Sequence, residues 1–125
     1  MGCRPICNTL RTEPCGRLAE RKIDNLLFSR IDWQQLSKKV EVDIPPNQLL
    51  IFGRGKGGPY MLKEAPLVAL DIPFKAAVWQ DPSGKVWLSY TNGTFIGQRY
   101  AIGNADASAK DIDATIEKIA EEALK

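Results

Sequence analysis

Two strand-forming segments joined by a tight-turn sequence restrict the fold of this chain more than any other feature. Residues 74–80 (FKAAVWQ) and 85–91 (KVWLSYT) are rich in valine and aromatic side chains, which favour β-structure. Between them lies Asp81-Pro82-Ser83-Gly84, in which every residue is a common turn former. Alternation along an antiparallel hairpin predicts one face made of Phe74, Ala76, Val78, Val86, Leu88 and Tyr90. The opposite face is then expected to present Lys75, Trp79, Lys85 and Trp87.

Two more strands and a capped helix are indicated before this hairpin. Apolar runs of strand length predict strands over residues 26–31 and 49–52, the second of them central in the sheet. Asp32 stands where its carboxylate can cap a short helix that ends near Val40. This order predicts strand, helix, strand ahead of the hairpin.

Helical patterns lie between and after these strands. Residues 60–70 have a helical composition interrupted at Pro66, which favours a kink or two short helices with Pro66 in a first turn. A second apolar stripe predicts a helix that packs on the sheet through Ile112, Ile116, Ile119, Ala120 and Ala123. Strands in a run with helices at intervals indicate an α+β fold rather than repeated βαβ units.

The chain length sets the expected domain organisation. A chain of 125 residues suits one globular domain with a modest core. Residues 1–16 mix proline, glycine and arginine without an apolar period, so they are expected to be an irregular N-terminal segment. Residues 17–125 are expected to form a single α+β domain, in which a short helix can form over residues 17–22.

Charge and hydropathy exclude several classes of partner. Seventeen basic and fifteen acidic side chains give a net charge of +2, too little for a general nucleic-acid binder. The longest apolar runs are far shorter than the ~20 residues needed to span a bilayer, so no membrane segment is expected. The chain also opens without a signal-peptide pattern, and a cytoplasmic location is therefore expected.

The chain contains no histidine, which limits its possible chemistry. Histidine is the commonest general base and zinc ligand, so carboxylate, lysine, tyrosine and cysteine chemistry remain. Cys3, Cys7 and Cys15 lack Cys-x-x-Cys spacing and are odd in number, which argues against a disulfide framework and a structural metal. No metal and no cofactor are therefore expected. A thiol-carrier role for the three cysteines is a weaker hypothesis.

The segment from Gln48 to Tyr90 resembles a bacterial and archaeal family known as domain of unknown function 302. The resemblance covers about residues 26–100 and rests on RID at residues 30–32, the prolines before LLIFG, a Gly/Lys loop, Ala65-Pro66, LDIPFK at residues 70–75, and DPSGKVWLSY. It implies one curved, mainly antiparallel sheet covered by helices, of the TATA-binding-protein-like class. It also implies a homodimer, and it implies no biochemical function.

The chain departs from the pattern of that family in three places. The loop reads Gly53-Arg54-Gly55-Lys56-Gly57-Gly58-Pro59 where Asn-Pro-Lys-Ala-Gly-Thr-Pro is closer to the family, and Trp33 stands where a histidine is frequent. Residues 1–16 resemble neither the first strand nor the long helix with which family members begin. A missing strand, an altered start and an unusual replacement all fit this difference.

The glycine-rich loop is the leading candidate site. Glycines allow backbone amides to turn toward an anion, Lys56 adds a positive charge, and a following helix start adds its positive end. The candidate ligand-binding residues of the loop are Gly53, Gly55, Lys56, Gly57 and Gly58. The loop has neither Walker nor dinucleotide spacing, so a tight turn between strand and helix is the alternative.

Other candidates are polar residues at strand ends and two tryptophans. Asp71, Asp32 and Lys75 are a candidate polar cluster in which a carboxylate and a lysine exchange a proton with a ligand. The alternative is that the two aspartates serve local backbone groups. Trp79 and Trp87 share one face of the hairpin and are candidate interface residues, with a second core layer as the alternative.

These observations support two hypotheses of different class. The first is a cytoplasmic, non-catalytic module that dimerises and binds a small ligand or protein near the glycine loop and Asp71. The second is an enzyme that acts on a phosphorylated or otherwise anionic small molecule, with the loop holding the anion and Asp71 or Lys75 as acid or base. The absence of histidine and of a recognisable nucleophile favours the first, and no catalytic residue is assigned.

Overall fold

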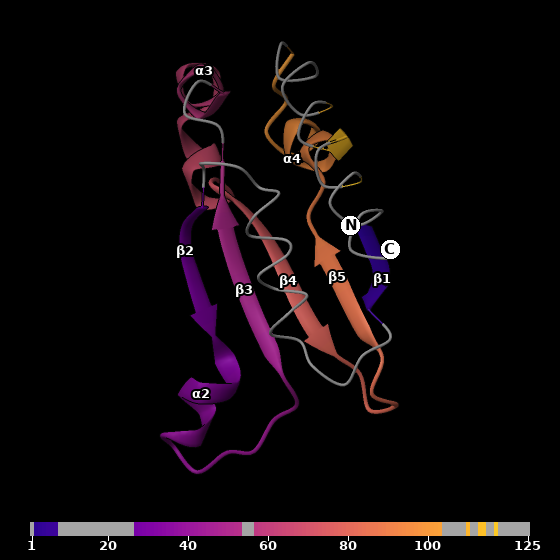
Figure 1. Cartoon of the computed structure of the whole chain (residues 1–125). Helices are drawn as coiled ribbons and strands as arrows, with labels where there is room; N and C mark the ends of the chain where they lie inside the picture. Colours follow the sequence, from indigo (N-terminus) through magenta and orange to yellow (C-terminus); the bar gives the residue numbers. More distant parts are fainter. Residues whose placement is uncertain are drawn as a thin grey trace.

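One five-stranded antiparallel sheet forms the frame of the protein. The structure is a computed structural model that describes residues 2–7, 27–53 and 57–103, together with positions 110, 113, 114 and 117. The strands are β1 (Gly2–Cys7), β2 (Leu27–Asp32), β3 (Asn47–Phe52), β4 (Phe74–Gln80) and β5 (Val86–Tyr90). Their order is β1-β5-β4-β3-β2, and all four pairings are antiparallel (Figure 1).

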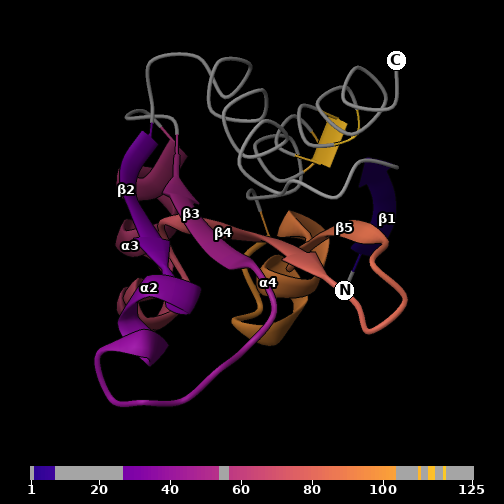
Figure 2. The ribbon, with the colours of Figure 1, turned by 60° about the horizontal axis from the view of Figure 1, so that its bottom comes forward.

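The described helices are short, and all of them except α4, which follows β5, lie between two strands in the chain. They are α2 (Trp33–Lys38), α3 (Gly57–Glu64), the 3-10 helix η1 (Pro66–Leu70) and α4 (Gly93–Arg99). Figure 2 shows α3 and α4 on the same side of the sheet. No helix in the described part of the chain is long and apolar enough to cross a membrane.

The core lies between the sheet and these helices. Burial alternates along β3, β4 and β5, and the residues that point inward include Leu50, Val78 and Val86, each with 0% of its surface exposed. From the helical side, α3, η1 and α4 contribute Met61, Val68 and Ile96. The predicted hairpin and its buried face are confirmed, and so is the α+β class with a single antiparallel sheet.

The helix boundaries follow local signals in the sequence. Asp32 caps α2 as predicted, because its Oδ1 accepts a hydrogen bond of 3.0 Å from the backbone N–H of Gln35. The interrupted helix consists of two helices, α3 and η1. Pro66 is the first residue of η1, a position whose N–H would make no hydrogen bond within the helix. The predicted C-terminal helix is described only at four positions, all helical, and its apolar stripe lies outside the described residues.

The N-terminal prediction is wrong for Gly2–Cys7. These residues form β1, which pairs with β5 from Gly2 opposite Tyr90 to Cys7 opposite Val86, with a register shift between Pro5 and Cys7. Pro5 is tolerated because β1 is an edge strand, where one row of N–H groups needs no partner. Residues 2–7 show no apolar alternation, so their sequence does not predict a strand. The strand forms because its backbone pairs with β5. The remainder of residues 1–16 and the predicted helix over residues 17–22 lie outside the described residues.

Helix α4 has no counterpart in the sequence-based prediction. Its start is fixed by Asn92, whose side-chain oxygen accepts a hydrogen bond of 2.7 Å from the N–H of Phe95. Ile96 then anchors the helix in the core with 1% of its surface exposed. The signal in the sequence was Asn92 alone, because the short segment after it contains two glycines and shows only a weak apolar period.

Candidate functional site

The end of β3 and the start of β4 form one corner of the sheet. Phe52 pairs with Phe74, so the residues just beyond this pair, Gly53 and Pro73, are brought together. A Cβ placed on Gly53 would lie 3.7 Å from the Cβ of Pro73 and 3.4 Å from Cε2 of Phe28. The Ile72–Pro73 peptide bond is cis. The glycine that ends the strand therefore lies against this cis peptide.

The start of α3 reaches the same corner. A Cβ on Gly58 would lie 3.6 Å from Cδ1 of Ile72. We name the group of Gly53, Gly58, Ile72 and Pro73 the glycine–proline site. Two of the predicted loop residues thus lie in one place. Gly57 begins α3, whereas Gly55 and Lys56 lie outside the described residues.

The fold does not require glycine at the two described positions of this site. Neither Gly53 nor Gly58 has a positive φ, unlike Gly84 with a φ of 88°. The nearest atoms to an added Cβ stand at ordinary van der Waals distances of 3.4 and 3.6 Å. A second common reason for glycine is the close approach of another molecule to the backbone. The alternative of a turn that demands glycine is therefore not supported at these positions.

Asp71 connects the end of η1 to the end of α4. Its Oδ2 accepts a hydrogen bond of 2.6 Å from the hydroxyl of Tyr100 and lies 3.2 Å from Nη1 of Arg99. The hydrogen bond to Asp71, with burial as a smaller cause, raises the pKa of Tyr100 above its usual value. The Asp71 carboxylate is thus already engaged by one hydroxyl and one guanidinium. Sequence analysis missed both partners, which follow Asp71 by 28 and 29 residues.

Lys75 makes a different contact. Its Nζ donates a hydrogen bond of 3.2 Å to the backbone oxygen of Pro73. It pairs with Ile51 across the sheet and so lies on the face opposite the core. The ammonium group is close to the glycine–proline site, but the described contacts do not join it to Asp71. The predicted proton exchange between these two residues has no direct contact in the described structure.

Asp32 does not belong to this corner, so the predicted cluster with Asp71 and Lys75 is wrong. Asp32 pairs with Gln48 at the start of β3, whereas Gly53 follows the end of that strand. Five residues of extended chain separate Gln48 from Gly53, a distance of about 17 Å. The side chain of Asp32 caps α2 instead.

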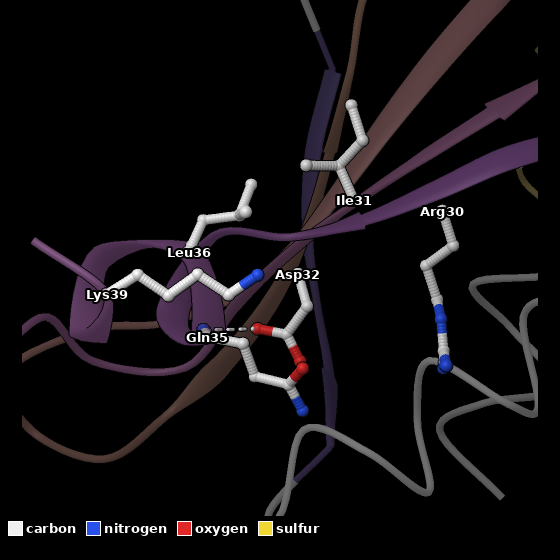
Figure 3. A pocket seen from close by; sticks show the side chains of 6 residues that line it. All are labelled: Arg30, Ile31, Asp32, Gln35, Leu36 and Lys39. Atoms are coloured by element: carbon white, nitrogen blue, oxygen red, sulfur yellow. Dashed lines mark hydrogen bonds between the residues drawn. The ribbon is translucent and has the colours of Figure 1, made fainter.

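A pocket does lie beside Asp32, where β2 ends and α2 begins. Its volume is about 380 Å³, and its walls come from β2 and α2 (Figure 3). The lining residues are Arg30, Ile31, Asp32, Gln35, Leu36 and Lys39. The sequence analysis had recognised only the RID segment and the cap. The contribution of Gln35, Leu36 and Lys39 follows from the turn of α2 back toward the strand that precedes it.

Trp79 and Trp87 stack on the face of the sheet opposite the core. Their ring centroids are 6.4 Å apart at an interplanar angle of 21°. Both indole N–H groups are satisfied, by Ser89 Oγ and by Asp81 Oδ2, each at 2.8 Å. Lys85 Nζ lies 4.6 Å from the centroid of Trp87. The shared face is confirmed, and both tryptophans are half-buried in the single chain.

Comparison with known proteins identifies a family and a fold. A family model described as Domain of unknown function DUF302 matches residues 18–123. The crystal structure of an uncharacterised conserved protein DUF302 from Bacillus stearothermophilus is similar, with a TM-score of 0.72 over 98% of this chain and 94% of that chain. The sequence identity is 17%, so this likeness concerns the fold.

Curated relatives match a smaller part of a longer protein. Proteins named fluoride-specific ion channel FluC 1 from Brucella suis biovar 1 and from Brucella abortus biovar 1 are each 33% identical over 85 residues. The match covers 67% of this chain but only 34% and 32% of those proteins. The chain therefore spans about a third of the length of these relatives.

Proposed function

The chain belongs to the family Domain of unknown function DUF302, and we propose that it is a non-catalytic module that binds a small anionic ligand at the glycine–proline site. The observation that supports this proposal most directly is the glycine pair. Gly53 and Gly58 meet at the Ile72–Pro73 peptide although the backbone requires glycine at neither position. An open backbone at one corner of a sheet provides N–H groups that a ligand can approach closely.

The local charges favour an anion over a cation. The eight-residue helix α3 begins at this corner and has no acidic residue in its first turn, so its partial positive end is not compensated from within. Asp71 directly precedes Ile72 of this site in the chain, and its carboxylate is paired with Arg99. Lys75 adds an ammonium group beside Pro73. These charges together leave the corner positive.

The same contacts support binding rather than catalysis. Asp71 is held by Tyr100 and Arg99, and the Lys75 ammonium is held by the Pro73 carbonyl. Neither group is placed to take or give a proton in the described contacts. One observation favours the alternative of an enzyme acting on an anionic small molecule, namely the short hydrogen bond between Tyr100 and Asp71 near the corner. Turnover of an anionic substrate that stops in Tyr100→Phe would establish that alternative.

Dimerisation and a cytoplasmic location are parts of the same proposal. The family resemblance is the reason to expect a homodimer, and the sequence offers no reason to expect a nucleic-acid or membrane partner. The Brucella relatives are named for fluoride. Because the chain matches only about a third of each of them, that name serves here to choose a probe anion.

Thermal unfolding in the presence of inorganic phosphate and of fluoride tests the proposal. We expect one of the two anions to raise the unfolding temperature, and Gly58→Ala to weaken its apparent affinity about tenfold, the value of one lost contact of moderate strength. Gly103→Ala is the matched control, because a Cβ there meets nothing within 4 Å. Lys56→Ala tests the charge of the loop independently.

The outcomes are distinct. An equal loss of affinity in Gly58→Ala and Gly103→Ala would show a general effect on stability rather than a site. Stabilisation that is unchanged by Gly58→Ala would place the anion elsewhere and reject the glycine–proline site. If neither anion stabilises the protein, the ligand is not a simple anion and the proposal in this form is wrong.

A further inference from the structure

The pocket beside Asp32 has an apolar side and a polar side. Its volume of about 380 Å³ lies near the low end of the roughly 300–1,000 Å³ typical of small-molecule sites, so it suits a small ligand. Figure 3 shows Ile31 and Leu36 on one side, and the Asp32 carboxylate with the Gln35 amide on the other. A ligand that matches this pocket is therefore partly apolar and partly polar.

Two oppositely charged groups of the pocket do not pair with each other. Lys39 extends along α2 toward Asp32 (Figure 3), but no ion pair joins the two side chains among the described contacts. The described hydrogen bonds of Lys39 involve only its backbone. Its ammonium group, which has three donors, is therefore available to a ligand.

The Asp32 carboxylate also has unused capacity. Its Oδ1 accepts one hydrogen bond of 3.0 Å from the backbone N–H of Gln35, whereas an ionised carboxylate can accept about four. Arg30 is the other charged residue of the lining, but it already has an interaction within the chain, and Figure 3 shows its side chain directed away from α2. We therefore assign Arg30 no contact with a ligand.

A zwitterion is complementary to these two charges. Its ammonium group can donate to Asp32 while its carboxylate accepts from Lys39, which gives two charge-assisted hydrogen bonds. A simple anion would pair with Lys39 but would also lie beside the Asp32 carboxylate, where like charges repel. A simple cation has the converse problem with Lys39. The arrangement of charge thus discriminates against ligands that carry one charge only.

We propose that this pocket binds a small zwitterionic amino acid with a branched apolar side chain. The ammonium group of the ligand contacts Asp32, its carboxylate contacts Lys39, and its side chain packs against Ile31 and Leu36. The site is separate from the glycine–proline site, because Asp32 pairs with the start of β3 and Gly53 follows the end of that strand. The inference therefore goes beyond the proposed function and does not depend on it.

Isothermal titration calorimetry with L-leucine as the probe tests the site. Lys39→Gln and Asp32→Asn each remove one charge, and the asparagine retains an oxygen that can cap α2. We expect each variant to weaken the affinity for L-leucine about tenfold, the value of one charge-assisted hydrogen bond. Lys38→Gln is the matched control, because it removes the same charge from the same helix at a residue outside the pocket lining.

Two analogues of leucine separate the contributions of its charges. Isocaproate has the carboxylate and the branched chain without the ammonium group, and isopentylamine has the ammonium group without the carboxylate. We expect both to bind the wild type more weakly than L-leucine does. The remaining affinity for isocaproate should depend on Lys39, and that for isopentylamine on Asp32. Thermal unfolding of each variant confirms that it is folded.

Each outcome decides the inference. Tighter binding of L-leucine than of either analogue, weakened in Lys39→Gln and Asp32→Asn but not in Lys38→Gln, supports it. Equal affinity for L-leucine and isocaproate would overturn the zwitterion in favour of an anion. An equal loss in Lys38→Gln, or no loss in the two pocket variants, would overturn the site. Absence of binding up to about 10 mM L-leucine would overturn the proposal as a whole.

Competition distinguishes this pocket from the glycine–proline site. Saturating L-leucine should leave the thermal stabilisation by inorganic phosphate or fluoride additive, because the two ligands occupy opposite ends of β3. Displacement of the anion by L-leucine would show a single site and overturn the separate pocket. If neither anion stabilises the protein while L-leucine binds as described, the proposed function is wrong and this inference stands.

Discussion

The centre of the sheet and the region around β2 both contain large apolar side chains, but these are buried in the centre and exposed around β2. In the centre, Leu50 and Val78 have no exposed surface, and the helices α3 and α4 cover that face. On β2 and in the turn after α2, Phe28 and Val40 expose 62% and 69% of their surface, although both are strongly apolar. The free energy of folding is therefore expected to come mainly from the centre. The region around β2 retains apolar surface that can be buried by association.

The largest predicted effect comes from two leucines that differ in burial. Leu50→Ala removes a side chain that is 0% exposed, and we expect it to lower the free energy of unfolding by about 2–5 kcal/mol through lost burial and a cavity. Leu36→Ala, at a side chain 42% exposed, should change it by about 0.5 kcal/mol or less in the monomer. Urea unfolding measures both. Similar losses in the two variants would show that Leu36 is part of the folding core.

A second effect concerns the turn that closes the central hairpin. Gly84 has a φ of 88°, a conformation that places the Cβ of any other residue too close to its own backbone. We expect Gly84→Ala to cost about 1–2 kcal/mol of stability in the same urea experiment. Gly103→Ala lacks this positive φ and serves as the control. A neutral Gly84→Ala would indicate that the turn relaxes and that the centre depends less on its hairpin than on its core.

The sequence predicted the parts of the fold that depend on neighbours along the chain. The hairpin followed from its turn residues and from alternation, the start of α2 from Asp32, and the break between α3 and η1 from Pro66. Each of these signals acts within a few residues of the structure it causes. Strand β1 was missed because its pairing depends on β5, whose paired residues lie 79 to 88 positions away in the chain.

The candidate site was predicted only in part for the same reason. Gly53 and Gly58, which flank one short loop, lie beside the adjacent residues Pro73 and Ile72. Asp32 was wrongly grouped with Asp71, since its place at the far end of β2 follows from the antiparallel register with β3 and not from any local pattern. The partners of Asp71 on α4 required a helix that the sequence analysis did not predict.

A third and smaller effect is expected at the start of α2, which directly follows β2. Asp32→Ala removes the carboxylate that accepts the N–H of Gln35, and loss of such a cap costs about 1 kcal/mol. Asp32→Asn keeps an acceptor and should restore most of that stability. Hydrogen exchange at the α2 amides locates the effect. Equal exchange in the two variants would mean that tertiary contacts, rather than the cap, fix the helix.

The smallest expected effect is a pH dependence at the hairpin turn of the centre. The pKa of Asp81 is lowered from 3.8 to about 2, first by the hydrogen bond from the Ser83 hydroxyl and then by the one from the Trp87 indole. The folded state thus favours the charged carboxylate. Asp81 should contribute its full stabilisation above pH 3.8 and lose it as the pH falls from 3.8 through about 2.

Asp81→Asn tests this dependence, because an amide does not titrate. The unfolding temperature of the variant should start lower near neutral pH and fall less between pH 4 and pH 2 than that of the wild type, since the linked protonation of residue 81 is absent. Asp43→Asn, at an exposed position, changes the net charge equally and should follow the wild-type slope. If both variants flatten the acid slope alike, the effect is one of overall charge. The hydrogen bonds of Asp81 would then make no specific contribution to the stability of the folded protein at acid pH.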